Sequence, residues 1–128
     1  MTQTIIVADD HPLFRAALKQ AVSQAVPDAK TVEVDSIKAL QAAVESHPDA
    51  DLVLLDLNMP GAHGFSGLVF MRGQYPGLPV VVVSGSEEMQ VMRRSIDYGA
   101  SGFIPKSAPL PTITEAIQAV LELSLIHI

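Results

Sequence analysis

The chain of 128 residues is 48% hydrophobic and 17% charged, which suits one folded domain and argues against disorder. It has no cysteine, so disulfides and thiolate metal sites are excluded, and its net charge of −6 argues against direct nucleic-acid contact. The N-terminus is unlike a signal peptide and no apolar run approaches the roughly 20 residues of a membrane helix, so we expect a cytoplasmic protein without membrane contact.

Five short apolar or β-branched segments predict strands. Three of them are nearly continuous in apolar residues, which is typical of parallel strands that are covered on both faces. The predicted strands are residues 4–8, 31–34, 52–55, 80–83 and 102–104.

Stretches with apolar residues three and four positions apart alternate with these strands and predict helices. In the first, the apolar positions begin at Leu13 and continue to Val22, and in the third, Gly67 and Gly73 indicate a mobile or bent helix. An apolar strip in the fifth, which includes Ile113 and Ile117, is expected to be core rather than a dimer interface. The predicted helices are about residues 13–22, 37–44, 65–75, 87–98 and 110–121.

Residues with known preferences at helix ends support these boundaries. Pro12 suits the first turn of the first helix, and Ser36 suits the N-cap of the second. Glu87 and Glu88 favour the start of the fourth helix, and Gly99 suits the position just after its end.

The alternation of strand and helix predicts an α/β fold of the (βα)₅ kind. Right-handed crossovers place such a chain in a doubly wound, parallel, five-stranded sheet of the flavodoxin-like type, with strand order 2-1-3-4-5. The predicted domain covers residues 1–122, and residues 123–128 are treated as a separate tail.

Polar residues follow all five of the predicted strands, at the edge of the sheet where ligands bind in this fold class. Asp35 and Ser36 follow the second strand, which lies at the sheet edge and away from the point where the strand order switches. The residues expected to converge are Asp9, Asp10, Asp56, Ser84 and Lys106.

Three carboxylates in one place repel one another, and a divalent cation removes this conflict. Mg²⁺ prefers a few carboxylates, a carbonyl and retained waters. Lys106 and Ser84 would then suit a phosphoryl group carried by one carboxylate, because phosphoryl transfer depends on positioning and charge neutralisation. Each residue alone has a simpler explanation, as a turn former, a helix cap or a solvated lysine, and it is their occurrence together that favours a site.

The strand ends resemble those of the response-regulator receiver domain of two-component signalling. The resemblance extends from Ile5 to about Leu121, and its first and last motifs are most similar to the NarL/LuxR-type subfamily, whose members usually carry a C-terminal helix-turn-helix DNA-binding domain. The motifs are IVADDH (residues 6–11), LDLNMPG (55–61), VSG (83–85) and GASGFIPKS (99–107).

The resemblance implies that Asp56 is the nucleophile that takes a phosphoryl group from a phosphohistidine of a sensor histidine kinase. It implies that Asp10 and Asp56 bind Mg²⁺ directly, that Asp9 acts mainly through water, and that Asn58 contributes its backbone carbonyl. Such a domain is a phosphoacceptor that gains and loses its phosphoryl group, rather than a turnover enzyme.

The resemblance also implies a switch. Lys106 pairs with one phosphoryl oxygen, Ser84 donates a hydrogen bond to another, and Gly85 keeps the path to Asp56 open. Phe103 matches the aromatic residue that turns inward with Ser84, although an apolar residue on the last strand is equally expected in the core. The output is a shift in conformational populations at the face formed by the fourth helix, fifth strand and fifth helix, which acts on the chain's own DNA-binding domain. A homodimer on phosphorylation is left open.

Two further features of the sequence are not explained by the family motifs. Ser107 follows Lys106 where many members have a proline on a cis peptide bond, and a cis bond is not assumed here because it would cost roughly 2.5–4 kcal/mol. The histidines at positions 11, 47 and 63 lack the spacing of metal ligands. His11 lies near the predicted acidic pocket and could touch it, but it is interpreted as a surface residue at a helix start.

The tail, LSLIHI, resembles a translated sequencing-library adapter, which would mean that the parent protein continues into an effector domain that is missing here. The alternative is an ordinary last turn of the fifth helix. Comparing the gene's nucleotides with the source genome beyond codon 122 distinguishes the two.

Three other kinds of function are less consistent with the sequence. A phosphatase of the haloacid-dehalogenase type needs an acid at position 58, where this chain has Asn58, and the chain lacks length for a cap domain. A flavodoxin-like or dinucleotide site would need a phosphate loop or G-x-G-x-x-G motif, neither of which is present. The remaining alternative is a receiver-like interaction module that is not phosphorylated, and the intact set of five polar residues argues against it.

Overall fold

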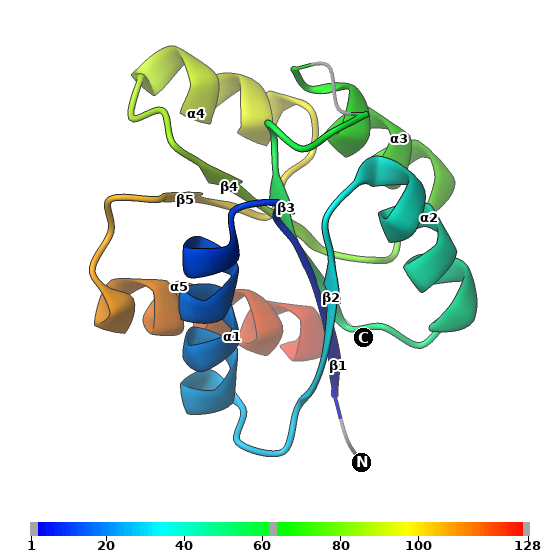
Figure 1. The fold of residues 1–128 in the computed structure, drawn as a ribbon, viewed down its shortest axis with the longest axis vertical. Helices are drawn as coiled ribbons and strands as arrows, with labels where there is room; N and C mark the ends of the chain where they lie inside the picture. The colour runs from blue at the N-terminus through cyan, green and yellow to red at the C-terminus, as the bar shows by residue number, and fades with distance from the viewer. Residues whose placement is uncertain (1–2, 62–63, 127–128) are drawn as a thin grey trace.

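A computed structural model describes residues 3–61 and 64–126, which form a parallel sheet with helices on both faces (Figure 1). The strands are β1 (Thr4–Ala8), β2 (Lys30–Val34), β3 (Leu52–Asp56), β4 (Val80–Ser84) and β5 (Gly102–Pro105). The helices are α1 (Pro12–Ala25), α2 (Ile37–Ser46), α3 (Ser66–Gln74), α4 (Met89–Asp97) and α5 (Leu110–Ile126).

The five strands are parallel and lie in the order β2-β1-β3-β4-β5. The predicted fold class and strand order are therefore confirmed. Each of the three central strands is buried along its whole length, which explains their nearly continuous apolar sequences.

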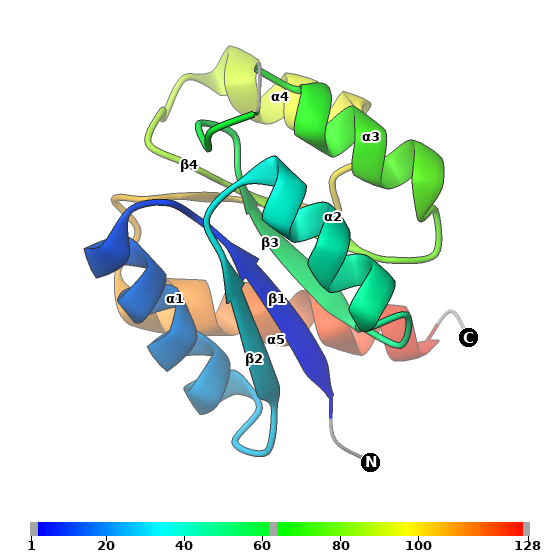
Figure 2. The ribbon, with the colours of Figure 1, turned by 45° about the vertical axis from the view of Figure 1, so that its right-hand side comes forward.

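The helices form two layers, with α1 and α5 on one face of the sheet and α2, α3 and α4 on the other (Figure 2). Alternate side chains of each central strand enter opposite layers, so that Ile6 packs with α2 and α3 while Ile5 and Val7 pack with α1 and α5. No helix in the described ranges is long and apolar enough to cross a membrane.

Helix α1 begins where Pro12 predicts, but its buried face is narrower than expected. Leu18 and Val22 are buried, whereas Leu13 is 90% exposed. The expectation that the apolar stripe starts at Leu13 was wrong, because Leu13 lies on a different side of α1 from Phe14, Leu18 and Val22, which pack toward the sheet.

Two helix starts were predicted from capping residues, with different outcomes. The Ser36 hydroxyl accepts a hydrogen bond from the Ala39 amide at 3.1 Å, so its N-cap role is confirmed. Helix α4 begins at Met89 rather than at Glu87, because Glu88 has an extended backbone with φ −63° and ψ 130°.

Helix α5 extends beyond its predicted end near Leu121 and reaches Ile126. Ile113, Ile117 and Val120 are buried and Ala116 is partly buried against the sheet, so the prediction that this strip is core is confirmed.

The two glycines of α3 differ in their surroundings. A Cβ on Gly67 would lie 2.8 Å from the Ile37 side chain, so this glycine allows α2 and α3 to pack closely. A Cβ on Gly73 would meet nothing within 4 Å. The prediction that both mark a mobile helix overlooked this packing role of Gly67.

Gly99 ends α4 in a left-handed conformation, with φ +101°. Its amide donates to the carbonyl of Ile96 at 2.9 Å, and the Ala100 amide donates to that of Ser95 at 3.0 Å. This pair of bonds is the Schellman motif, which confirms the predicted C′ position. A Cβ here would also lie 3.0 Å from the Arg72 side chain.

We expect Gly99→Ala to lower the free energy of unfolding by about 1–2 kcal/mol, because alanine at positive φ is strained. Gly73→Ala is the matched control, because it places a methyl group in open space within a helix and should stabilise by up to about 1 kcal/mol. Urea titration followed by circular dichroism measures both. Equal effects of the two substitutions would contradict this account of Gly99.

Candidate phosphoacceptor site

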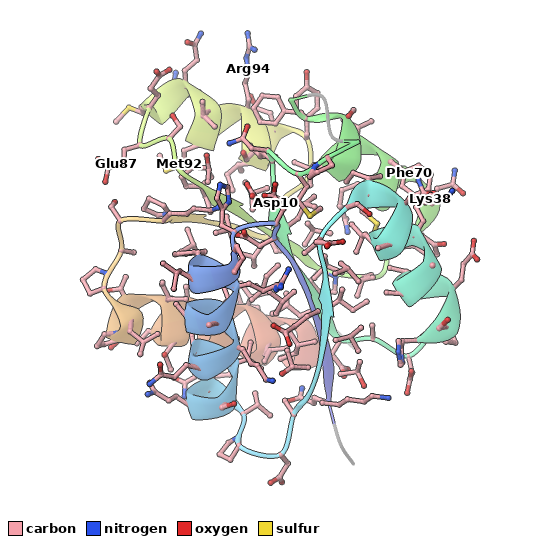
Figure 3. All side chains as sticks on the ribbon, viewed as in Figure 1. Asp10, Lys38, Phe70, Glu87, Met92 and Arg94 are labelled. Carbon is pink, nitrogen blue, oxygen red and sulfur yellow. The ribbon has the colours of Figure 1, made fainter. Side chains whose placement is uncertain are left out.

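The carboxyl ends of the strands bring the candidate residues to one edge of the sheet. Asp9 directly follows β1, Asp56 ends β3, Ser84 ends β4, and Lys106 directly follows β5. Because β1 and β3 are neighbours at the switch in strand order, their terminal carboxylates meet there. In Figure 3, Asp10 lies in this central region above the strand ends.

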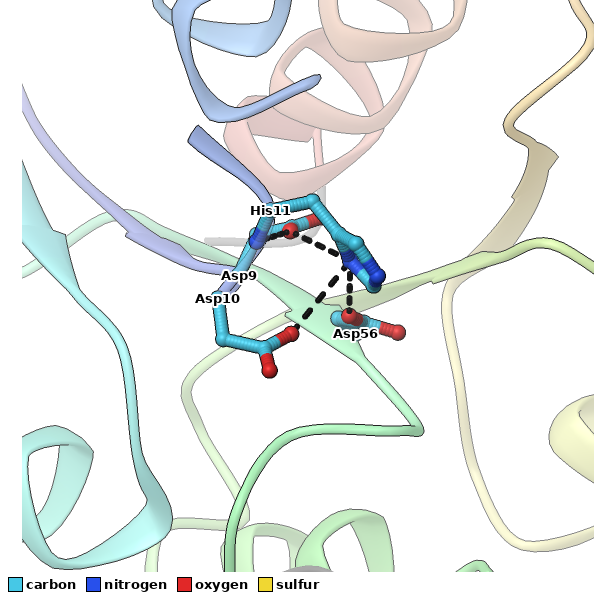
Figure 4. Close-up of side chains that lie close together, drawn as sticks. All are labelled: Asp9, Asp10, His11 and Asp56. Carbon is cyan, nitrogen blue, oxygen red and sulfur yellow. Dashed lines mark hydrogen bonds and ion pairs between the residues drawn. The ribbon is translucent and has the colours of Figure 1, made fainter. Parts of the chain in front are cut away.

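Four side chains offer ligand atoms that all lie within 4.8 Å of one another: those of Asp9, Asp10, His11 and Asp56 (Figure 4). The Asp9 and Asp56 side chains are fully buried, and that of Asp10 is 31% exposed. Three carboxylates are therefore concentrated in one largely buried place.

Lys106 supplies positive charge to this cluster. Its Nζ lies 3.2 Å from Asp56 Oδ2 and 3.1 Å from Asp9 Oδ2, and its side chain is only 17% exposed. The ammonium also lies 5.1 Å from the centre of the Phe14 ring, at cation–π distance. These contacts exclude the simpler explanation of a solvated surface lysine.

Backbone amides orient the carboxylates. The Asn58 amide donates to Asp56 Oδ1 at 3.0 Å, and the His11 amide donates to Asp9 Oδ1 at 2.7 Å. The Lys106 amide donates to the Ser84 carbonyl at 2.7 Å, which fixes the start of the Lys106 loop to β4. The part of the chain that is described contains no cis peptide bond, so the Lys106–Ser107 bond is trans.

Two oxygens of the cluster, Asp9 Oδ2 and Asp10 Oδ1, are buried and accept no hydrogen bond. Lys106 Nζ is within ion-pair distance of the first and His11 Nδ1 is 3.3 Å from the second, but neither is placed to donate. Orphaned carboxylate oxygens are costly in a protein interior. A hard divalent cation with oxygen ligands would satisfy them, so these residues fit Mg²⁺.

His11 lies at the start of α1, as predicted, and its ring also contacts the acidic pocket. Its side chain is 60% exposed, as a surface residue would be, yet its Nδ1 lies 3.3 Å from Asp9 Oδ1 and 3.5 Å from Asp56 Oδ2. The expectation that the histidines offer no metal site is wrong for His11, because His11 belongs to a group of side chains that could hold a metal ion. His63 lies outside the described residues.

The remaining candidates are Ser84, Phe103, Asn58 and Gly85. Ser84 is 2% exposed, and its hydroxyl accepts the Ser86 amide at 3.1 Å. Phe103 is partly buried and packs against the core on the α2–α4 side, as the simpler explanation expects. A pocket of about 470 Å³ lies beside the cluster, and Asn58 and Gly85 contribute to its wall. It is lined by His11, Pro12, Leu13, Phe14, Asn58, Gly85 and Lys106.

Sequence reasoning did not find Phe14. Its signal was its place in the first turn of the helix that follows the acidic pair, which brings an aromatic ring to the rim of the site. The ring lies beneath an ammonium group that comes from the other end of the chain.

Comparison with known proteins agrees with this geometry. The family model described as the response regulator receiver domain matches residues 5–118. The chain belongs to this family. It is a receiver domain of a two-component response regulator, of the NarL/LuxR type, and receiver domains are signalling modules.

The glycerol metabolism activator of Pseudomonas putida is 44% identical over 91% of this chain, and NarL, the nitrate/nitrite response regulator of Escherichia coli K12, is 33% identical over 89%. These matches cover 53% and 52% of the relatives, so the chain spans about half their length. The receiver domain of the NarL of Mycobacterium tuberculosis superposes with a TM-score of 0.82 at 28% identity, over 94% of this chain and 97% of that one.

We expect Lys106→Met to lower the free energy of unfolding by about 1–3 kcal/mol in EDTA, because buried carboxylates lose their cationic partner. Lys38→Met is the matched control, since Lys38 is exposed on α2, and it should change little. Urea denaturation measures both variants. A Lys106→Met protein as stable as the control would show that the ammonium does not stabilise the cluster.

Proposed function

We propose that this receiver domain accepts a phosphoryl group on Asp56 from a phosphohistidine of a sensor histidine kinase. The observation that carries the proposal is the buried Asp56 carboxylate, which has an ammonium at 3.2 Å and two further carboxylates beside it. The set unites a nucleophile, a positive charge and an acidic cation site at the edge of one sheet.

In the transfer, an oxygen of Asp56 attacks phosphorus and forms a new O–P bond. The P–N bond of the phosphohistidine breaks, its electron pair stays on the kinase imidazole, and that ring takes up a proton. The backbone amide of Asn58 donates a hydrogen bond to Oδ1 of Asp56, so the carboxylate is fixed before the phosphoryl donor arrives. Lys106, which already contacts Oδ2, pairs with an oxygen of the transferred group.

The proposed cofactor is Mg²⁺, held by Asp10 and Asp56 directly, by Asp9 mainly through water, and by the backbone carbonyl of Asn58. When bound, this ion neutralises charge on the carboxylates and on the phosphoryl oxygens. The two orphaned oxygens of Asp9 and Asp10 support the assignment.

The proposed switch starts at Ser84. Its hydroxyl is engaged by the Ser86 amide in this structure and would turn to donate to the phosphoryl group, and Phe103 would move inward with it. Gly85, on the wall of the pocket, leaves the approach to Asp56 open. The change would reach the face of α4, β5 and α5. Met92 (labelled in Figure 3) is exposed on α4, and so is Ile96.

The proposal also includes an effector domain in the parent protein. Curated relatives of about twice this length are named as transcriptional activators and regulators, so we place a DNA-binding effector domain after the receiver in the parent protein. The domain would work in the cytoplasm as a phosphoacceptor and not as a turnover enzyme. The proposed receiver domain covers residues 1–122.

Incubation with acetyl phosphate and Mg²⁺ should add one phosphoryl group to the wild-type chain, measured by intact mass. Asp56→Asn should add none, because its amide is not a nucleophile for phosphorus. Asp35→Asn is the matched control, since Asp35 also follows a strand but lies at the sheet edge, and it should be labelled normally. Absence of labelling in a folded wild-type chain would favour the interaction module that is never phosphorylated.

Mg²⁺ should also raise the melting temperature of the unphosphorylated chain, because it binds the folded state alone. At ten times its dissociation constant the gain is about 1.4 kcal/mol, or a few degrees for a domain of this size. Asp10→Asn should abolish the shift and Asp35→Asn should keep it. Identical melting curves with and without millimolar Mg²⁺ would refute the proposed cation site.

A further inference from the structure

His11 stands at the N-cap of α1, but its side chain does not cap the helix. It makes no hydrogen bond to the amides of the first turn, and Pro12 follows it directly. A residue before proline is held in an extended conformation, and here φ is −94° and ψ is 106°. The ring turns toward the acidic cluster instead, so capping does not account for its position.

The ring nitrogen occupies the space between the carboxylates. Nδ1 lies 3.3 Å from an oxygen of Asp9, 3.3 Å from one of Asp10 and 3.5 Å from one of Asp56 (Figure 4). It also lies 2.8 Å from Lys106 Nζ. Nearly equal distances to three carboxylates mark the position that a cation shared by them would take.

An imidazole is a poor permanent occupant of this position. One ring nitrogen offers a single N–H or a single lone pair, and it cannot satisfy three carboxylates. Asp9 Oδ2 and Asp10 Oδ1 remain without a hydrogen bond beside it. Mg²⁺ selects oxygen ligands over imidazole, so the ring is not expected to stay as a ligand of that ion.

The His11 ring is held by few packing contacts. Its side chain is 60% exposed, so little packing is lost when it turns out. The His11 backbone amide also donates to Asp9 Oδ1, at 2.7 Å, and this contact is kept when the ring moves. The neighbouring pocket, lined in part by His11 and Phe14, gives the ring room.

We propose that His11 is a displaceable plug of the cation site, whose imidazole has to leave the carboxylates before they can hold Mg²⁺. The inference rests on the proposed Mg²⁺ site and adds a positioning residue to it. The apparent affinity for the ion is then reduced by the fraction of molecules in which the ring is out. The imidazole of His11 thereby competes with Mg²⁺ for the carboxylates.

Isothermal titration calorimetry with MgCl₂ on the full chain tests the plug. His11→Ala should lower the dissociation constant by roughly tenfold, as expected if the ring is out in about one molecule in ten. His47→Ala is the matched control, because His47 caps α2 through its backbone amide and precedes the amino end of β3, far from the cluster. It should leave the dissociation constant unchanged.

The outcomes separate the two proposals. Wild type that binds Mg²⁺ together with a His11→Ala variant of equal or weaker affinity overturns the plug and leaves the cation site standing. No binding by either chain overturns both. Binding by His11→Ala alone supports the plug in its strongest form.

Nuclear magnetic resonance gives a readout that is independent of affinity. The ring signals of His11 should shift when Mg²⁺ is added to the wild-type chain, and those of His47 should not. Asp10→Asn, which removes a proposed ligand, should suppress the shift. A His11 ring that keeps its signals while Mg²⁺ binds overturns the plug, because the ring has then not left its place.

Discussion

The main physical constraint in this receiver domain is the concentration of three carboxylates at one edge of a parallel sheet. Two of them are fully buried, and a single ammonium from the far end of the chain compensates them. Such a cluster cannot be explained as a stabilising device, since buried charge is costly even when it is paired. It persists because apolar strands packed on both faces hold the strand ends in place.

The fold could be predicted from the sequence because its main determinant is periodic. Continuous apolar runs identified the central strands, and glycine and serine at helix ends identified boundaries such as Gly99 and Ser36. The convergence of Asp9, Asp56 and Lys106 followed from the topology alone, because strands that run parallel end at the same edge. The chemical roles of these residues came from the family resemblance.

What could not be predicted depends on side-chain direction and on the limits of the sheet. Spacing treats Leu13 and Leu18 as one stripe, but only Leu18 lies on the side of α1 that packs against the core. A histidine beside two aspartates has the same sequence whether its ring faces solvent or the carboxylates, and this is decided by torsion angles that no pattern encodes. The start of α4 could not be predicted for a similar reason. Acidic residues suit a first turn, but they do not determine the backbone conformation of Glu88, which is extended.

The order of the site along the chain has a consequence for synthesis. Asp9 and Asp10 are made first and Asp56 follows, whereas Lys106 reaches the ribosome exit only when most of the domain has emerged. Until β5 pairs with β4, a nascent chain would bring the carboxylates together without their lysine. The electrostatic cost of closing the acidic edge therefore falls late in folding, when the last strand docks, and a chain cut before β5 would have to meet that cost with free cations or leave the edge open.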